Sequence, residues 1–157
     1  MILVPRHPKR MKEIINLIEE YQFKYSVRSQ NESQCSDNQI YLADTIGELP
    51  LWYSSCSVTF VAVSLLPIGG HTPYEPALYS SAIIHGQYFS NFEKIYSKLN
   101  SNSGAIKTNN PKQISTAWEK LRDKGYRKNT ILIANNILFG SNKKEELITS
   151  ILEKLKP

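Results

Sequence analysis

The sequence contains few of the side chains that bind metals or cross-link secreted domains. It has two cysteines, Cys35 and Cys56, and three histidines among 157 residues. The cysteines lack the close spacing of a metal-ligand pair. So few cysteines suit a reducing compartment better than a disulfide-linked secreted domain. We therefore expect no metal site and no structural disulfide.

The chain also lacks a run of about eighteen apolar residues, the length that a membrane-spanning helix needs, and it shows no secretory signal pattern. Its net charge of +5 is mildly basic. The basic residues are dispersed, and no nucleic-acid-binding module is recognisable. We therefore expect neither a transmembrane segment nor a nucleic-acid partner. The charge either solvates the surface or attracts an anionic nucleotide-sugar or an acidic membrane face.

Short apolar strands alternate with helical segments along the chain. Residues 58–63 form a β-branched run of the kind buried on both faces of a parallel sheet, and residues 11–21 carry apolar side chains at helical spacing. This alternation predicts one α/β domain over 1–157, with the sheet within about 1–107 and terminal helices within about 111–156. The expected strands are 2–4, 24–29, 39–42, 58–63, 82–85 and 105–107; the expected helices are 11–21, 49–55, 74–79, 91–99, 111–124, 130–139 and 143–155. In the helix from Pro111, the expected buried stripe is Ile114, Ala117, Trp118 and Leu121.

One segment, from Ser64 to Pro76, combines several features of a nucleotide site. Its adjacent glycines, Gly69 and Gly70, allow a sharp turn and a close approach to a ligand. A short helix then begins, and its first N–H groups suit a phosphate. Glu75 is placed to accept hydrogen bonds from sugar hydroxyls, although a carboxylate there also simply suits the helix dipole. Strand, glycine turn, helix and acidic residue form the layout of a nucleotide site in an α/β sheet, with an ordinary tight turn as the alternative.

Two further turns follow predicted strands at the edge where open α/β sheets bind ligands. After residues 2–4, Arg6 can fork onto phosphate or carboxylate oxygens. His7 either contacts a ligand or braces the turn. After residues 39–42, backbone groups of the segment Thr45-Ile46-Gly47 can read a base edge. The alternative for that segment is a capped turn that opens the next helix.

These segments resemble the 3-deoxy-D-manno-octulosonic acid (Kdo) transferases of lipopolysaccharide synthesis, which are two-domain GT-B glycosyltransferases that use CMP-Kdo as donor. The run SLLPIGGHTPYEP at 64–76 is similar to the family's S-L-[VL]-P-I-G-G-H-N-P-L-E-P. VPRHPKR at 4–10 is similar to V-P-R-H-P-E-R, and YLADTIGEL at 41–49 to Y-L-G-D-T-M-G-E-L. A weaker match to G-x-x-x-x-N-F lies at 86–92. The blocks follow the family's order and cover nearly the whole chain.

The resemblance implies a Rossmann-like sheet similar to the C-terminal domain of a GT-B enzyme, with CMP-Kdo or CMP as partner. The family's Pro-Arg pair contacts CMP, and the turn after 39–42 cradles its cytidine. The implied donor-binding residues are Pro5, Arg6, His7, Thr45, Ile46, Gly47, Ser64, Gly69, Gly70, His71, Thr72, Pro73, Tyr74 and Glu75. The family's catalytic glutamate belongs to its N-terminal domain, so no catalytic residue, metal or cofactor is expected here. The implied location is the cytoplasm, at the cytoplasmic face of the bacterial inner membrane.

The chain also departs from the family. Members are more than twice as long, and this chain aligns from the second strand of the C-terminal domain. We expect the first strand and helix to be missing, which in a sheet of order 3-2-1-4-5-6 leaves two strand edges unpaired. The family's glycine pair before Ser64 is Ala62-Val63 here, its asparagine is Thr72, and its leucine is Tyr74.

Three functions fit this sequence. The first is the donor-binding part of a Kdo transferase, inactive alone and dependent on a separate N-terminal glycosyltransferase polypeptide. The second is a non-catalytic remnant or degenerate nucleotide-binding module of a disrupted Kdo transferase gene. A generic Rossmann-like binder of another nucleotide-sugar is the third, and the blocks at 4–10 and 64–76 together argue against it.

Overall fold

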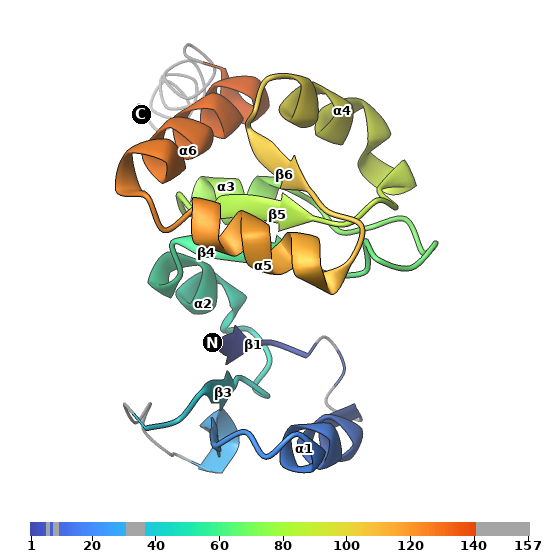
Figure 1. Ribbon diagram of the computed structural model, residues 1–157, viewed down its shortest axis with the longest axis vertical. Coiled ribbons are helices and arrows are strands. Elements are labelled where there is room, and N and C mark those ends of the chain that lie inside the picture. The colour runs from blue at the N-terminus through green and yellow to red at the C-terminus, as the bar shows by residue number, and fades with distance from the viewer. Residues whose placement is uncertain (6, 8–9, 31–36, 141–157) are drawn as a thin grey trace, which may run out of the picture. The chain divides into compact units, whose positions relative to one another are not determined.

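The structure is a computed structural model that describes residues 1–5, 7, 10–30 and 37–140. The predicted site residue Arg6 and the helix expected at 143–155 lie outside these residues. The chain divides into two compact units, Met1–Trp52 and Tyr53–Pro157 (Figure 1). The boundary falls within helix α2 (Leu49–Ser55).

Unit 1 contains a three-stranded parallel sheet in the order β1-β3-β2. Its strands are β1 (Ile2–Leu3), β2 (Tyr25–Val27) and β3 (Ile40–Leu42). Helix α1 (Met11–Glu20) connects β1 to β2, and a 3₁₀ helix, η2 (Arg28–Gln30), follows β2. Four of these elements lie within a few residues of the predicted ranges; the turn of 3₁₀ helix replaces the end of the strand expected at 24–29.

The strand order of unit 1 corrects one prediction. A missing first strand should leave β1 and β3 with facing edges unpaired, yet the two strands pair directly, with Ile2 opposite Tyr41 and Leu3 opposite Leu42. Strand β2 pairs with the other side of β3. All three residues of β3 are buried, which is the pattern of a central strand. The order β1-β3-β2 therefore differs from the predicted one, in which β2 would pair with β1.

The side chains of β3 alternate between two apolar clusters, as the period of a strand requires. Ile40 and Leu42 pack with Ile18 of α1 and Val27 of β2. On the other face, Tyr41 and Ala43 pack with Trp52, Ile2 and Val4. The rings of Tyr41 and Trp52 lie 5.6 Å apart between centroids.

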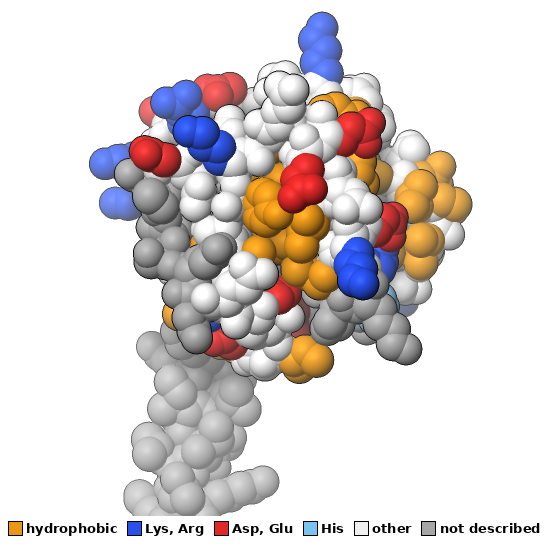
Figure 2. Space-filling model, turned by 90° about the horizontal axis from the view of Figure 1, so that it is seen from below, with side chains coloured by type: hydrophobic (Ala, Val, Ile, Leu, Met, Phe, Trp, Pro, Cys, Tyr) orange, Lys and Arg blue, Asp and Glu red, His pale blue; other side chains and the backbone are white. Residues whose placement is uncertain are grey.

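Three large apolar side chains around the end of α1 remain exposed: Leu17, Tyr21 and Phe23. The rings of Tyr21 and Phe23 stack with centroids 6.5 Å apart. Figure 2 shows hydrophobic side chains beside acidic ones on one face of the molecule.

Unit 2 contains a second three-stranded parallel sheet in the order β4-β5-β6. Its strands are β4 (Val58–Val61), β5 (Ala82–His85) and β6 (Ala105–Lys107), and its helices are α3 (Tyr74–Leu78), α4 (Glu93–Ser101), α5 (Pro111–Lys120) and α6 (Lys124–Phe139), with a 3₁₀ turn, η3 (Ser90–Phe92), before α4. The prediction for β5 and β6 is correct at both ends. Helix α6 begins six residues earlier than expected, at Lys124, because Asp123 caps it by accepting a 2.6 Å hydrogen bond from the N–H of Tyr126.

Helices cover both faces of this sheet (Figure 1). Ile83 packs with residues of α3, α4 and α6. Ala82 and Ile84 point to the other face, where Ala117 and Leu121 of the α5 region cover them. Trp118 departs from the predicted buried stripe because its side chain is 37% exposed. No helix in the described part of the chain is long and apolar enough to cross a membrane.

Candidate functional site

The predicted glycine turn follows β4 and needs both of its glycines. Gly69 and Gly70 have φ angles of +102° and +75°, in the region that favours glycine. A Cβ on Gly69 would lie 2.5 Å from Nδ2 of Asn91, and one on Gly70 would lie 2.9 Å from the carbonyl oxygen of Tyr88. The N–H of Gly70 donates to the carbonyl of Val63 at 3.1 Å, which closes the turn.

Asn91 of η3 fixes this turn from the other side. Its backbone N–H donates to the carbonyl of Gly69 at 3.1 Å. Its side-chain amide donates to the carbonyl of Gly70 at 3.3 Å. Asn91 is not among the predicted site residues, although it is the asparagine of the G-x-x-x-x-N-F block, which was the available signal.

Ser64 joins the carboxyl ends of β4 and β5. Its buried hydroxyl donates to the carbonyl of Val61 at 2.6 Å and accepts from the N–H of Gly86 at 2.7 Å. A Cβ on Gly86 would lie 2.1 Å from the carbonyl oxygen of Ser64, so the two chains touch here. With both hydrogen-bonding functions used inside the protein, Ser64 shapes the turn rather than presenting a free hydroxyl.

Val63 has a φ of +63°, which is a rare conformation for a β-branched residue. It lies where the resembling family has glycine, and it ends β4 two residues earlier than predicted. The valine therefore adopts a backbone conformation that glycine would adopt without steric cost.

The segment from His71 to Glu75 leads into α3. The carbonyl of His71 accepts from the hydroxyl of Tyr96 at 3.0 Å. The hydroxyl oxygen of Thr72, which replaces the family's asparagine, accepts from the N–H of Tyr74, the first residue of α3, at 3.3 Å. Among the first three residues of α3, the N–H of Tyr74 is bonded to Thr72 and Pro76 has no N–H. Only the N–H of Glu75 is therefore left to meet a ligand. The helix start thus supplies fewer donors than the sequence pattern predicts.

The carboxylate of Glu75 is exposed and accepts from the hydroxyl of Tyr53 at 3.5 Å. Burial, and then the charge of Glu75, raise the pKa of Tyr53 to about 12, so the phenol stays protonated and able to donate. Tyr53 also stacks on Tyr79 with ring centroids 6.2 Å apart. Sequence reasoning missed Tyr53, because only the fold brings its hydroxyl to Glu75.

His85 is the last residue of β5. It is fully buried, with Nδ1 2.7 Å from the carbonyl oxygen of Gly86 and Nε2 2.9 Å from Oδ1 of Asn100. Its ring lies 4.2 Å from that of Tyr96, the residue that binds the His71 carbonyl. Burial outweighs these hydrogen bonds and lowers the pKa of His85, so the imidazole is neutral at pH 7.

The remaining predicted residues belong to unit 1. Pro5 and His7 follow β1, and Thr45, Ile46 and Gly47 follow β3. Because β1 and β3 are parallel neighbours, both segments leave the same edge of the sheet. The imidazole of His7 and the side chain of Ile46 are exposed, Ile46 by 85%. Among the residues that the structure describes, no three His, Cys, Asp or Glu side chains lie together as a metal site would require.

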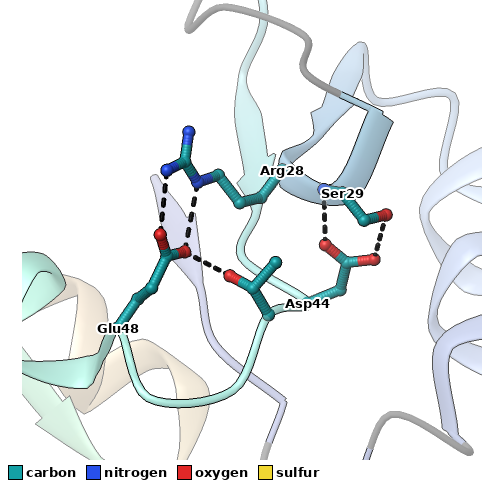
Figure 3. A network of polar contacts seen from close by, with 5 residues as sticks. Arg28, Ser29, Asp44 and Glu48 are labelled. Atoms are coloured by element: carbon teal, nitrogen blue, oxygen red, sulfur yellow. Dashed lines mark hydrogen bonds and ion pairs between the residues drawn. The ribbon is translucent and has the colours of Figure 1, made fainter.

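A network of polar contacts holds the turn after β3 (Figure 3). Arg28 donates to both carboxylate oxygens of Glu48, at 2.8 and 3.1 Å. The hydroxyl of Thr45 donates to the same carboxylate. The N–H and the hydroxyl of Ser29 donate to the two oxygens of Asp44, at 2.9 and 2.6 Å. The hydrogen bonds from Arg28 and then Thr45 lower the pKa of Glu48 to about 2.

Similar proteins agree on the family. The 3-deoxy-D-manno-octulosonic acid transferase of Haemophilus influenzae is 36% identical over 109 residues, which are 69% of this chain and 26% of that protein. The Rickettsia prowazekii transferase is 32% identical over 143 residues, 87% of this chain and 31% of that protein. The C-terminal CMP-Kdo binding domain of WaaA from Acinetobacter baumannii has a TM-score of 0.83 and 30% identity, over 87% of this chain and 72% of that domain. The chain belongs to the Kdo transferase family. No family model matches it.

This membership confirms the resemblance of the sequence motifs and the predicted fold. The parallel sheets with flanking helices are those of the C-terminal domain of a GT-B Kdo transferase. The chain spans 26% and 31% of the Haemophilus and Rickettsia Kdo transferases. It therefore corresponds to part of such an enzyme, and one structural counterpart is a domain described as binding CMP-Kdo.

Proposed function

We propose that this chain is the donor-binding part of a Kdo transferase and that it binds CMP-Kdo through the CMP moiety. The observation that carries the proposal is the fold match to the CMP-Kdo binding domain of WaaA, which extends over 87% of the chain. The positive-φ glycines at 69 and 70 support it, since they form the turn that the family resemblance assigns to donor binding.

Each group of proposed donor-binding residues has a distinct role. The exposed carboxylate of Glu75 accepts hydrogen bonds from ribose hydroxyls. The backbone N–H of Glu75, in the first turn of α3, is left to donate to the nucleotide. The backbone of Thr45–Gly47 reads the cytosine edge. The guanidinium of Arg6 pairs with phosphate or carboxylate oxygens of the donor, for which its planar fork is suited.

In the proposed reaction, Kdo leaves CMP and joins an acceptor, a lipid A precursor. This chain holds the CMP leaving group and offsets its charge. A separate N-terminal glycosyltransferase polypeptide supplies the catalytic base and the acceptor site at the cytoplasmic face of the inner membrane. The purified chain alone therefore transfers no Kdo from CMP-Kdo, and adding an N-terminal domain of a Kdo transferase restores transfer in an assay with labelled donor.

Thermal unfolding of the 157-residue chain with and without CMP tests donor binding. A ligand at a hundredfold excess over its Kd stabilises the folded state by about 2.7 kcal/mol, which is an easily measured rise in Tm. We expect the rise with CMP to be lost in Glu75→Ala. Glu93→Ala is the matched control, because Glu93 is also exposed and in the first turn of a helix; its response to CMP should equal that of the wild-type chain.

A second candidate, a degenerate nucleotide-binding module without chemistry, is favoured by one observation. Val63 occupies a left-handed conformation where the family has glycine. A cooperative transition that CMP does not shift, in the wild-type chain as in Glu75→Ala, would support this candidate and contradict donor binding.

A further inference from the structure

We propose that Arg28 and Ser29 are positioning residues that hold the Thr45–Gly47 turn in the geometry that prefers cytosine to uracil. The proposal rests on the proposed function, in which this turn reads the base of CMP. Neither residue is among the predicted site residues, and both belong to η2, a separate segment of the chain (Figure 3).

The far end of the turn is held by Arg28 through Glu48. Two parallel hydrogen bonds, at 2.8 and 3.1 Å, fix both the distance and the plane of the carboxylate. The hydroxyl of Thr45 donates to Oε2 of the same carboxylate, so Glu48 joins η2 to the first residue of the turn. The guanidinium itself lies over the ring of Trp52, with Cζ 5.8 Å from the centroid, which limits its movement.

The near end of the turn is held by Ser29 through Asp44. Backbone N–H and hydroxyl of one serine bind the two oxygens of one carboxylate, at 2.9 and 2.6 Å. Asp44 and Glu48 therefore flank the turn and are both fixed to consecutive residues of η2. Between them, Gly47 has a φ of +87° and the side chain of Ile46 is exposed.

This arrangement is suited to base discrimination because the ends of the turn are fixed while its middle is exposed. Cytosine and uracil differ in the donors and acceptors at one edge, where an amino group in one replaces a carbonyl in the other. A backbone can tell them apart only if its N–H and C=O groups stay in place when the wrong base arrives. A turn that rearranges would satisfy either base.

The test is the ratio of the Kd values for UMP and CMP, measured by calorimetry on the 157-residue chain and its variants. We expect the wild-type chain to prefer CMP. We call the contacts Arg28–Glu48 and Ser29–Asp44 the clamp. Weakening one of these charge-assisted contacts should lower the preference about tenfold in Glu48→Gln and in Ser29→Ala, mainly by weakening the binding of CMP. Arg28→Lys keeps the charge but loses the two-pronged geometry, and should lower the ratio like Glu48→Gln.

Glu13→Gln is the matched control. It breaks a two-pronged pair with Arg10, at 3.0 and 3.1 Å, within the same unit but on α1, and should leave the ratio unchanged. If the clamp variants weaken CMP and UMP equally, the clamp is merely structural and the inference is overturned. If the wild-type chain binds neither nucleotide, the proposed function fails and the inference fails with it. A failure of the inference alone is distinguishable, because the wild-type chain then still binds CMP.

Discussion

Ser64 and Gly86, 22 positions apart in sequence, share a 2.7 Å hydrogen bond from the N–H of the glycine to the hydroxyl oxygen of the serine. The same hydroxyl donates to the carbonyl of Val61. This one buried side chain thus connects the ends of β4 and β5, next to Val63, whose carbonyl accepts the hydrogen bond that closes the glycine turn.

Ser64→Ala should therefore destabilise the protein. The substitution leaves a buried N–H and a buried carbonyl without this partner, at a cost of about 1–3 kcal/mol. Urea unfolding of the 157-residue chain, followed by circular dichroism, measures the change in the free energy of unfolding. Ser101→Ala removes an exposed hydroxyl that donates to the carbonyl of Ser97 and should shift the midpoint far less. Equal shifts for the two variants would contradict a structural role for Ser64.

Val63→Gly should stabilise the protein, which is unusual for a substitution by glycine. The left-handed conformation costs a residue with a Cβ roughly 1–2 kcal/mol, and glycine avoids that cost. The greater freedom of glycine in the unfolded chain offsets part of this benefit. We expect a net gain of about 1 kcal/mol in the free energy of unfolding. Val63→Ala keeps a Cβ and hence much of the strain; a stabilisation by alanine as large as that by glycine would argue against backbone strain as the cause.

The two glycines of the turn should respond differently to an added methyl group. Gly69→Ala meets the side chain of Asn91, whereas Gly70→Ala meets the backbone carbonyl of Tyr88. Both are destabilising because of their positive φ, by roughly 1–2 kcal/mol or more. In the Asn91→Ala background the cost of Gly69→Ala should fall, while that of Gly70→Ala should not. A double-mutant cycle on unfolding free energies measures both couplings.

The buried His85 makes stability depend on pH near neutrality. Its pKa is lowered in the folded state, chiefly by burial, so the unfolded chain binds a proton at this residue more readily. Stability from this group is complete above its ordinary pKa of 6.5 and falls as pH drops below it, by at most about 1.4 kcal/mol per pH unit. Urea midpoints at pH 7.5 and 5.5 should differ more for the wild-type chain than for His85→Gln. An equal difference in both proteins would show that His85 is charged or accessible in the folded state.

Much of the fold follows from local patterns in the sequence. Helix α2 and strands β5 and β6 have the predicted bounds, because apolar residues and breakers mark both ends of each. The glycine turn after β4 was predictable for the same reason, since adjacent glycines after an apolar strand have few other uses.

What sequence reasoning missed depends on contacts between distant segments. The direct pairing of β1 with β3 is a contact between distant segments, and no residue of either strand predicts it. Asn91 and Tyr53 reach Gly70 and Glu75 only through the fold. The strand predicted through Val63 ends at Val61 because the chain must turn toward Ser64, although valine favours extended backbone.

Each unit has a sheet and apolar clusters of its own, in unit 1 around Ile40 and Tyr41 and in unit 2 around Ile83 and Ile84. A denaturant curve for this chain should consequently show two transitions instead of one, since cooperativity belongs to each cluster. Unit 1, whose strands have two or three residues, should melt at the lower concentration. A nucleotide would then protect against unfolding selectively, and the transition that moves would identify the unit that bears its strongest contacts.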